Sequence, residues 1–167
     1  MSRGKLVWVG VVACTAAMLT ACSPTESGVI GVTVDEAGKV IVVLQDCKGD
    51  IDKLKLLDHV QTETTADDVV LAEWSNPRSP KGIVQFPLVE GAKGWKSQAP
   101  VPELDPTHRY SLKGRKKDGS SNAAAIAFTP TMLNDLQPGQ ILITKVLPRA
   151  NSTETVSLDE FTPEDCG

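Results

Sequence analysis

The stretch that decides the fold runs from residue 28 to 45 and reads GVIGVTVDEAGKVIVVLQ. In its first half, apolar residues alternate with small or polar ones, at Ile30, Val32 and Val34. This alternation has the period of a β-strand with one buried face. Residues 35–38 contain turn residues that let the chain reverse. Residues 40–44 are all apolar, so both faces of the second strand are expected to be buried. The stretch therefore predicts a β-hairpin whose second strand is central.

Short apolar or alternating segments continue through the rest of the chain, separated by turn residues. The segments expected to form strands are 53–59, 69–74, 83–86, 109–113, 123–129, 140–146 and 155–158. Residues 130–136 are the best helical candidate, because they end before Pro138. The Gly- and Pro-rich stretch 90–106 is expected to be an irregular loop. This pattern predicts an all-β fold, namely an antiparallel β-sandwich with one short helix.

The N-terminal segment has the composition of a secretory leader. Arg3 and Lys5 give it a positive end, and residues 6–19 carry no charge. An apolar run of roughly 14 residues fits the central region of a signal peptide, whereas a membrane-spanning helix needs about 20. The segment is therefore expected to be a helical signal peptide.

The leader ends in Leu19-Thr20-Ala21-Cys22. This sequence resembles the lipobox of bacterial lipoproteins, which is an aliphatic residue, a small or hydroxyl residue, Ala or Gly, and then Cys. The resemblance covers residues 1–22 and implies that Cys22 receives a diacylglyceryl group, with acyl chains such as palmitate, and becomes the first mature residue. Two acyl chains hold a protein stably, whereas one chain holds it weakly. The alternatives are an ordinary cleaved signal peptide and an uncleaved short span.

The chain is thus expected to divide into a signal peptide (1–21), a lipidated tether (22–28) and a single sandwich domain (29–167). It would lie on the extracytoplasmic face of the bacterial cell membrane, anchored through membrane lipid. Without Arg3 and Lys5, the chain has 15 basic and 21 acidic residues. This negative balance argues against nucleic-acid binding.

Two cysteines, Cys47 and Cys166, remain when the leader and Cys22 are set aside. In an oxidising compartment such a pair is expected to form a disulfide. The alternatives are two free thiols, or a metal site that also uses His59 or His108. The close ligand pairs of typical zinc sites are lacking, so no metal or other cofactor is expected.

The sequence contains none of the common catalytic motifs. Only His59 and His108 could act as imidazole bases, and each is expected at the surface or at a strand end. A Ser–His–Asp arrangement can still assemble from distant positions. A pocket that joins either histidine to a serine and a carboxylate would favour a hydrolase.

Three aspartates follow the second predicted strand, at Asp46, Asp50 and Asp52. Oxygen ligands at this spacing could bind Ca²⁺, but the match to an EF-hand loop is poor because the glutamate of that motif is missing. We therefore expect a solvated turn.

Basic residues concentrate around one predicted hairpin, at Arg109, Lys113, Arg115, Lys116 and Lys117. They could contact anionic headgroups or anionic wall polymers. Alternatively, they are a solvated hairpin tip whose charges prevent edge pairing. Among the aromatic residues, Trp74 is expected in the core. Trp95, which lies among glycines and lysines, is the candidate for an exposed aromatic that contacts a ligand.

Residues 104–110, LDPTHRY, resemble the approach to the tyrosine corner of immunoglobulin-like and fibronectin-type domains. The resemblance covers under ten residues and is consistent with a sandwich. Together these features predict a non-catalytic binding or interaction module at the cell envelope, with an envelope protein or wall polymer as partner. The alternatives are an envelope enzyme such as a hydrolase, and a structural subunit of an envelope complex.

Overall fold

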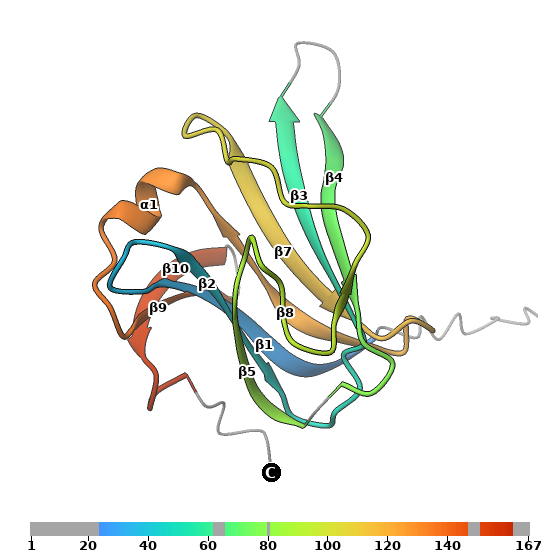
Figure 1. Cartoon of the computed structure of the whole chain (residues 1–167). Coiled ribbons are helices and arrows are strands. Elements are labelled where there is room, and N and C mark those ends of the chain that lie inside the picture. Colours follow the sequence, from blue (N-terminus) through green and yellow to red (C-terminus); the bar gives the residue numbers. More distant parts are fainter. Residues whose placement is uncertain (1–23, 62–65, 80, 147–150, 162–167) are drawn as a thin grey trace, which may run out of the picture.

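The computed structural model describes residues 24–61, 66–79, 81–146 and 151–161. Within these residues the elements, in chain order, are β1 (Thr25–Val34), β2 (Val40–Asp46), β3 (Lys53–Gln61), β4 (Ala66–Ser75), β5 (Gly82–Pro87), β6 (Lys96–Ser97), β7 (Arg109–Arg115), β8 (Ser121–Phe128), α1 (Pro130–Asn134), β9 (Gln140–Val146) and β10 (Asn151–Ser157). Strands dominate, so the prediction of an all-β fold with one short helix is confirmed (Figure 1).

The described strands belong to one hydrogen-bonded sheet. One arm has the order β5–β2–β1–β9–β10 and the other has the order β8–β7–β3–β4–β6. The arms meet where β1 pairs with β8 in parallel, whereas the other pairings are antiparallel. Neighbouring strands twist, and the sheet curls into a half-barrel around the core (Figure 1). The expected sandwich of two separate sheets is therefore not confirmed.

The hairpin predicted from residues 28–45 is present as β1 and β2. Its register places Ile30 opposite Leu44 and Val34 opposite Val40. In the turn, Asp35 Oδ1 accepts hydrogen bonds from the amides of Ala37 and Lys39 at 2.9 and 2.8 Å. Gly38 supplies the positive φ of 76° that the reversal requires.

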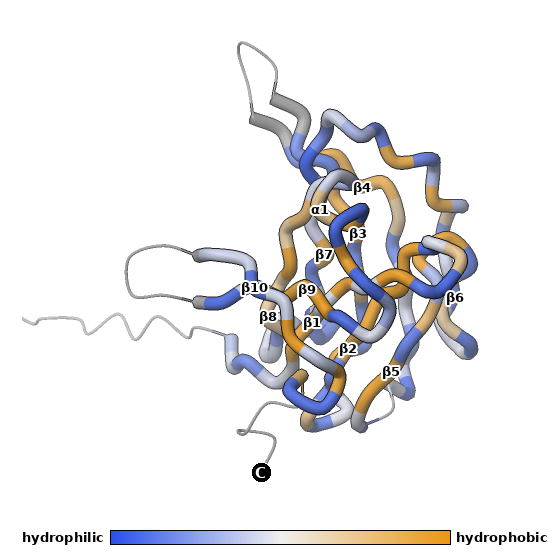
Figure 2. The backbone as a smooth tube through the Cα atoms, turned by 90° about the vertical axis from the view of Figure 1, so that its left-hand side faces the viewer, coloured by the Kyte–Doolittle hydropathy of each residue, from blue (hydrophilic) through white to orange (hydrophobic). Residues whose placement is uncertain are grey.

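Both faces of β2 are buried, as its continuous apolar run predicts. Val42 and Leu44 belong to the main core between the two arms. Val43 points to the opposite face and packs with Ile141 and Phe161 in a smaller cluster. Figure 2 shows that hydrophobic residues gather on the strands, whereas the turns are mainly hydrophilic.

Strand β1 begins earlier than the sequence suggests. Thr25 pairs with Ser121 and Glu26 pairs with Asn122, so residues 25–28 belong to the sheet. Residues 25–28 of the expected tether (22–28) are therefore held by the fold, because β8 pairs with Thr25 and Glu26 and the Ser27 hydroxyl donates to Asp50 Oδ1 at 2.7 Å. The sheet starts three positions after Cys22.

The single helix of the described residues, α1, is five residues long. The Thr129 hydroxyl caps its N-terminus by accepting from the Met132 amide at 3.4 Å, and Leu133 is its buried residue. In the described part of the chain, no helix has the length and apolar character to cross a membrane. The expected signal peptide (1–21) lies outside the described residues.

Candidate functional site

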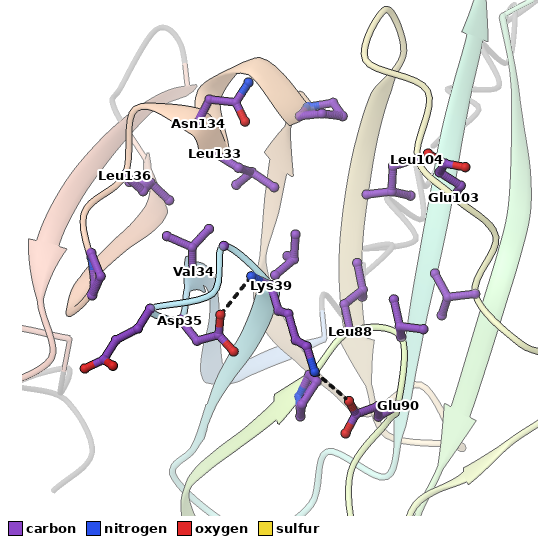
Figure 3. Close-up of a pocket in the computed structure, with 18 of the residues that line it drawn as sticks. Val34, Asp35, Lys39, Leu88, Glu90, Glu103, Leu104, Leu133, Asn134 and Leu136 are labelled. Carbon is purple, nitrogen blue, oxygen red and sulfur yellow. Dashed lines mark hydrogen bonds and ion pairs between the residues drawn. The ribbon is translucent and has the colours of Figure 1, made fainter.

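A pocket of about 760 Å³ opens beside α1. Its walls come from four segments that are distant in the sequence: the β1–β2 turn, the residues after β5, the loop before β7, and α1 with the residues that follow it (Figure 3). The lining residues include four prolines, Pro87, Pro102, Pro130 and Pro138, which fix the backbone φ in three of these walls.

Aliphatic side chains form the interior of the pocket. Val34, Leu88, Leu104, Leu133 and Leu136 converge on one space (Figure 3). Leu88, Leu133 and Leu136 also belong to the main core, so the pocket is an opening into the interior of the half-barrel. Concave sites of this size with apolar walls are typical of small-molecule binding.

The mouth of the pocket is negatively charged. Carboxylates come from Asp35, Glu36, Glu90 and Glu103, and Lys39 is the basic residue of the lining. The Nζ of Lys39 lies 3.3 Å from Oε1 of Glu90 in an exposed ion pair. Four carboxylates against one ammonium group leave the lining with a net charge of −3.

The sequence did not point to these residues as a site. The apolar pair Leu88-Val89 after Pro87, in a stretch with many turn residues, was the sequence signal that could have found them, and Val89 is 69% exposed in the structure. Their convergence depends on the curl of the sheet, which residue patterns do not show.

Trp95 is only 8% exposed and packs within the main core. Its interpretation as an exposed ligand-contacting aromatic is therefore wrong. Gly91 and Gly94 adopt positive φ, and the amide of Trp95 donates to the carbonyl of Ala92, so the chain turns tightly here and folds the indole inward. Trp74 is 1% exposed, which confirms its expected core position.

The basic residues do not form one cluster. Arg109 begins β7, Arg115 ends it, and Lys116 and Lys117 lie in the turn to β8. A strand of this length separates Arg109 from the turn by roughly 20 Å. The turn carries Lys116, Lys117 and Asp118, and Lys116 lies 3.7 Å from Asp118.

Asp46 is fully buried, so the expectation of a solvated turn is wrong at this position. Its carboxylate accepts hydrogen bonds from four backbone amides and one hydroxyl, those of Lys48, Gly49, Asp50, Ile51 and Ser79. Asp50 accepts from the hydroxyls of Ser27 and Ser121, both at 2.7 Å. These carboxylates therefore hold the loop and the adjacent strands. Across the described residues, no group of three or more His, Cys, Asp or Glu is placed to hold a metal.

Each histidine forms a pair with an aspartate. His108 Nδ1 lies 2.8 Å from Asp58 Oδ2, and His59 Nδ1 lies 2.5 Å from Asp68 Oδ1. The hydrogen bond to Asp58 raises the pKa of His108, and the negative charges of Asp58 and Asp105 act in the same direction. The pKa of Asp68 is lowered, mainly by its hydrogen bond to His59.

Most residues of the lipidation and disulfide predictions lie outside the part of the chain that the structure describes. Cys22 and Cys166 lie outside the described residues. Cys47 is described, and its amide donates to the carbonyl of Ser27 at 2.9 Å. The Cys47–Cys166 pairing stays a prediction.

The loop before β7 contains a tyrosine-to-backbone hydrogen bond of the kind that a tyrosine corner has, while the relation to immunoglobulin-like domains stays a prediction. The hydroxyl of Tyr110 accepts from the amide of Asp105, five positions upstream. Comparison with known proteins finds no matching family model, no similar curated protein and no similar solved structure. Function is therefore inferred from the residues and geometry of this chain alone.

Proposed function

We propose that the protein is a lipid-anchored, extracytoplasmic binding module whose pocket takes an apolar ligand with a positively charged group. The observation that carries this proposal is the apolar pocket with its acidic mouth. Its volume of about 760 Å³ falls within the range of roughly 300–1,000 Å³ found for small-molecule sites. The tyrosine-corner bond supports a relation to immunoglobulin-like sandwich domains, many of which bind without catalysing a reaction.

The early start of β1 supports the anchored arrangement. The amide of Thr25 donates to the carbonyl of Ser120 at 3.0 Å, so the β7–β8 turn lies beside the N-terminal end of β1. With Cys22 acylated, Arg115, Lys116 and Lys117 would lie near the headgroups. Each such charge contributes about 1 kcal/mol at an anionic surface. We therefore propose anionic lipid headgroups as the partner of this turn.

The ligand proposal is tested with three molecules that share one alkyl chain: dodecylamine, dodecanol and dodecanoate. Isothermal titration with the purified protein should rank the amine first, the alcohol second and the carboxylate last. The alkyl chain gains from the aliphatic walls, while the acidic mouth favours the cation. Equal affinity for the three, or no binding of the amine, would contradict the proposal.

Two variants distinguish the effect of the carboxylates at the pocket mouth from a general effect of the charge of the protein. Glu103→Gln should reduce the preference for amine over alcohol by about 3- to 10-fold, because one carboxylate of the mouth is neutralised. Glu26→Gln is the matched control, since Glu26 is exposed but lies on β1 outside this pocket. The control should retain the wild-type preference.

The membrane proposal is tested with vesicles that contain either anionic or zwitterionic lipids. The double variant Arg115→Gln/Lys117→Gln should lose most of the preference for anionic vesicles. The double variant Lys39→Gln/Arg109→Gln removes equal charge from the β1–β2 turn and from the start of β7, away from the β7–β8 turn, and should retain the preference. Mass spectrometry of membrane-extracted protein tests the anchor itself, and an unmodified Cys22 would refute it.

A further inference from the structure

Three side chains on adjacent strands form a hydrogen-bonded chain on the outer face of the sheet. Ser111 lies on β7, His59 on β3 and Asp68 on β4. The Oγ of Ser111 lies 3.0 Å from Nε2 of His59, and Nδ1 of His59 lies 2.5 Å from Oδ1 of Asp68. The register explains the contacts, because His59 stands directly opposite Asp68 and one step diagonal from Ser111.

The hydrogen-bond roles follow from the chemistry of the groups. An ionised carboxylate only accepts, so Nδ1 of His59 carries the proton that Asp68 receives. In the neutral imidazole, the Nε2 atom of His59 is then the acceptor for the hydroxyl of Ser111. A serine, a basic imidazole and a carboxylate that orients it are the parts of an activated nucleophile. The same hydrogen bond from His59 lowers the pKa of Asp68, which favours its ionised form.

Ser111 and His59 open onto a groove of about 670 Å³, which is distinct from the apolar pocket because the two share no lining residue. Ser111 and His59 line one wall, with Arg109 and Lys113 beside them. Residues of β8, α1, β9 and β10 also line the groove, and they include Ala127, Met132, Thr144, Ser152 and Thr153. The groove gives a substrate a route to the serine, which is itself 3% exposed.

Two cations flank the serine on the same face of β7. Arg109 and Lys113 stand two positions before and after Ser111, and both are exposed. Lys113 Nζ lies 3.3 Å from Asp68 Oδ2. Arg109 forms no ion pair with any described residue, so its guanidinium is available for an anionic group of a substrate.

We propose that Ser111 and His59 form a hydrolytic centre, with Asp68 as a positioning residue, and that it cleaves esters carrying a negative charge. The Ser111 oxygen attacks the ester carbonyl while His59 Nε2 takes the hydroxyl proton. The ester C–O bond then breaks, and the leaving alcohol takes that proton from His59. Water, deprotonated by His59, then attacks the carbonyl carbon of the acyl-serine. The bond between this carbon and the Ser111 oxygen breaks, His59 returns the proton to that oxygen, and the carboxylic acid is released. This activity is separate from ligand binding in the apolar pocket.

Labelling of the purified full-length protein with a fluorophosphonate probe tests the nucleophile. The probe should modify Ser111, as located by peptide mass spectrometry, and Ser111→Ala should abolish the label. His59→Gln should slow labelling by roughly 100-fold or more, the range for a lost general base. His108→Gln is the matched control, because His108 forms a similar pair with Asp58 away from Ser111. It should label at the wild-type rate.

The role of Asp68 is tested with a change in labelling rate that a purely structural role of this residue would not produce. Asp68→Asn should slow labelling, and Asp68→Glu should restore part of the rate because a carboxylate can again orient the imidazole. Circular dichroism confirms that each variant is folded. The proposal fails if the folded wild-type protein is not labelled on Ser111, or if both Asp68 variants label at the wild-type rate.

Substrate charge is tested with two aryl esters, p-nitrophenyl acetate and the monoanionic p-nitrophenyl succinate. Arg109→Gln should lower kcat/KM for the anionic ester by about 10-fold and leave the neutral ester nearly unchanged. An equal effect on both esters would overturn the assignment of an anionic substrate. The titrations with alkyl ligands measure binding in a different cavity. A negative result with the esters therefore does not contradict the proposal that the apolar pocket binds a ligand.

Discussion

The hydroxyl oxygen of Tyr110 lies 2.7 Å from the amide nitrogen of Asp105 and 3.3 Å from its carbonyl oxygen. The ring is buried and packs against Phe128, with ring centroids 6.0 Å apart. One side chain therefore joins the start of β7 to the loop that precedes it. Because Leu104 precedes Asp105 and lines the apolar pocket, this bond also supports one pocket wall.

Tyr110→Phe should lower the free energy of unfolding by about 1–2 kcal/mol, because the buried ring is kept while the hydrogen bonds to Asp105 are lost. Urea denaturation measures the change. Tyr110→Phe should also weaken dodecylamine binding, since the loop that carries Leu104 loses its hydrogen bonds to β7. A variant as stable as the wild type would mean that water replaces the hydroxyl without cost.

Asp46→Asn should destabilise the protein by about 2–3 kcal/mol. The carboxylate is fully buried and accepts hydrogen bonds through both oxygens, from Ile51 and Ser79 through Oδ2. An amide nitrogen at that position cannot accept, and hydrogen bonds to charged groups are among the stronger ones. Thermal or urea denaturation checks this. Asp118→Asn, in an exposed turn, is the control and should change stability little.

The His108–Asp58 pair should make stability depend on pH. The pKa of His108 is raised from the ordinary value of 6.5, so the folded state binds its proton more tightly than the unfolded state. This contribution is fully present below the unfolded pKa and is lost as pH rises through the folded pKa. Wild type should therefore exceed His108→Gln in stability by more at about pH 6 than at about pH 9. A difference that grows with pH would contradict the pairing.

The predicted disulfide between Cys47 and Cys166 is within reach of the chain. Phe161 packs with Val43, and the five residues from Phe161 to Cys166 can span about 17 Å. The four steps along the chain from Val43 through the end of β2 to Cys47 cover about 13 Å. The double variant Cys47→Ala/Cys166→Ala should lose about 4–5 kcal/mol, less any strain, as expected for a loop this long. Thiol counting in denaturant checks the bond, and two reactive thiols at these positions would exclude it.

Most strands follow from the alternation of apolar residues, because the pleat turns that pattern into one buried face. The start of β1 could not be found in this way, since backbone hydrogen bonds to β8 order Thr25 and Glu26 whatever their side chains. The start of β4 is polar, so the sequence pattern did not predict it for the same reason. In this part of β4, Asp68 pairs with His59 of β3.

The sites depend on register and on curvature, which no local pattern contains. Ser111 meets His59 because two strands pair with a particular offset. The apolar pocket forms because the sheet curls and brings α1 toward the β1–β2 turn. For Trp95 the sequence pattern predicted too much. Its polar neighbours suggested an exposed side chain, whereas the fold of the loop buries it.

The length of β1 sets the geometry of the whole module. Its ten residues extend about 33 Å, from Thr25 near the proposed anchor to Val34 in the pocket wall. With Cys22 held in the bilayer, a strand of this length would place the opening beside α1 well above the lipid. We therefore expect the pocket to take its ligand from solution or from a neighbouring macromolecule, and not from the lipid leaflet that holds Cys22.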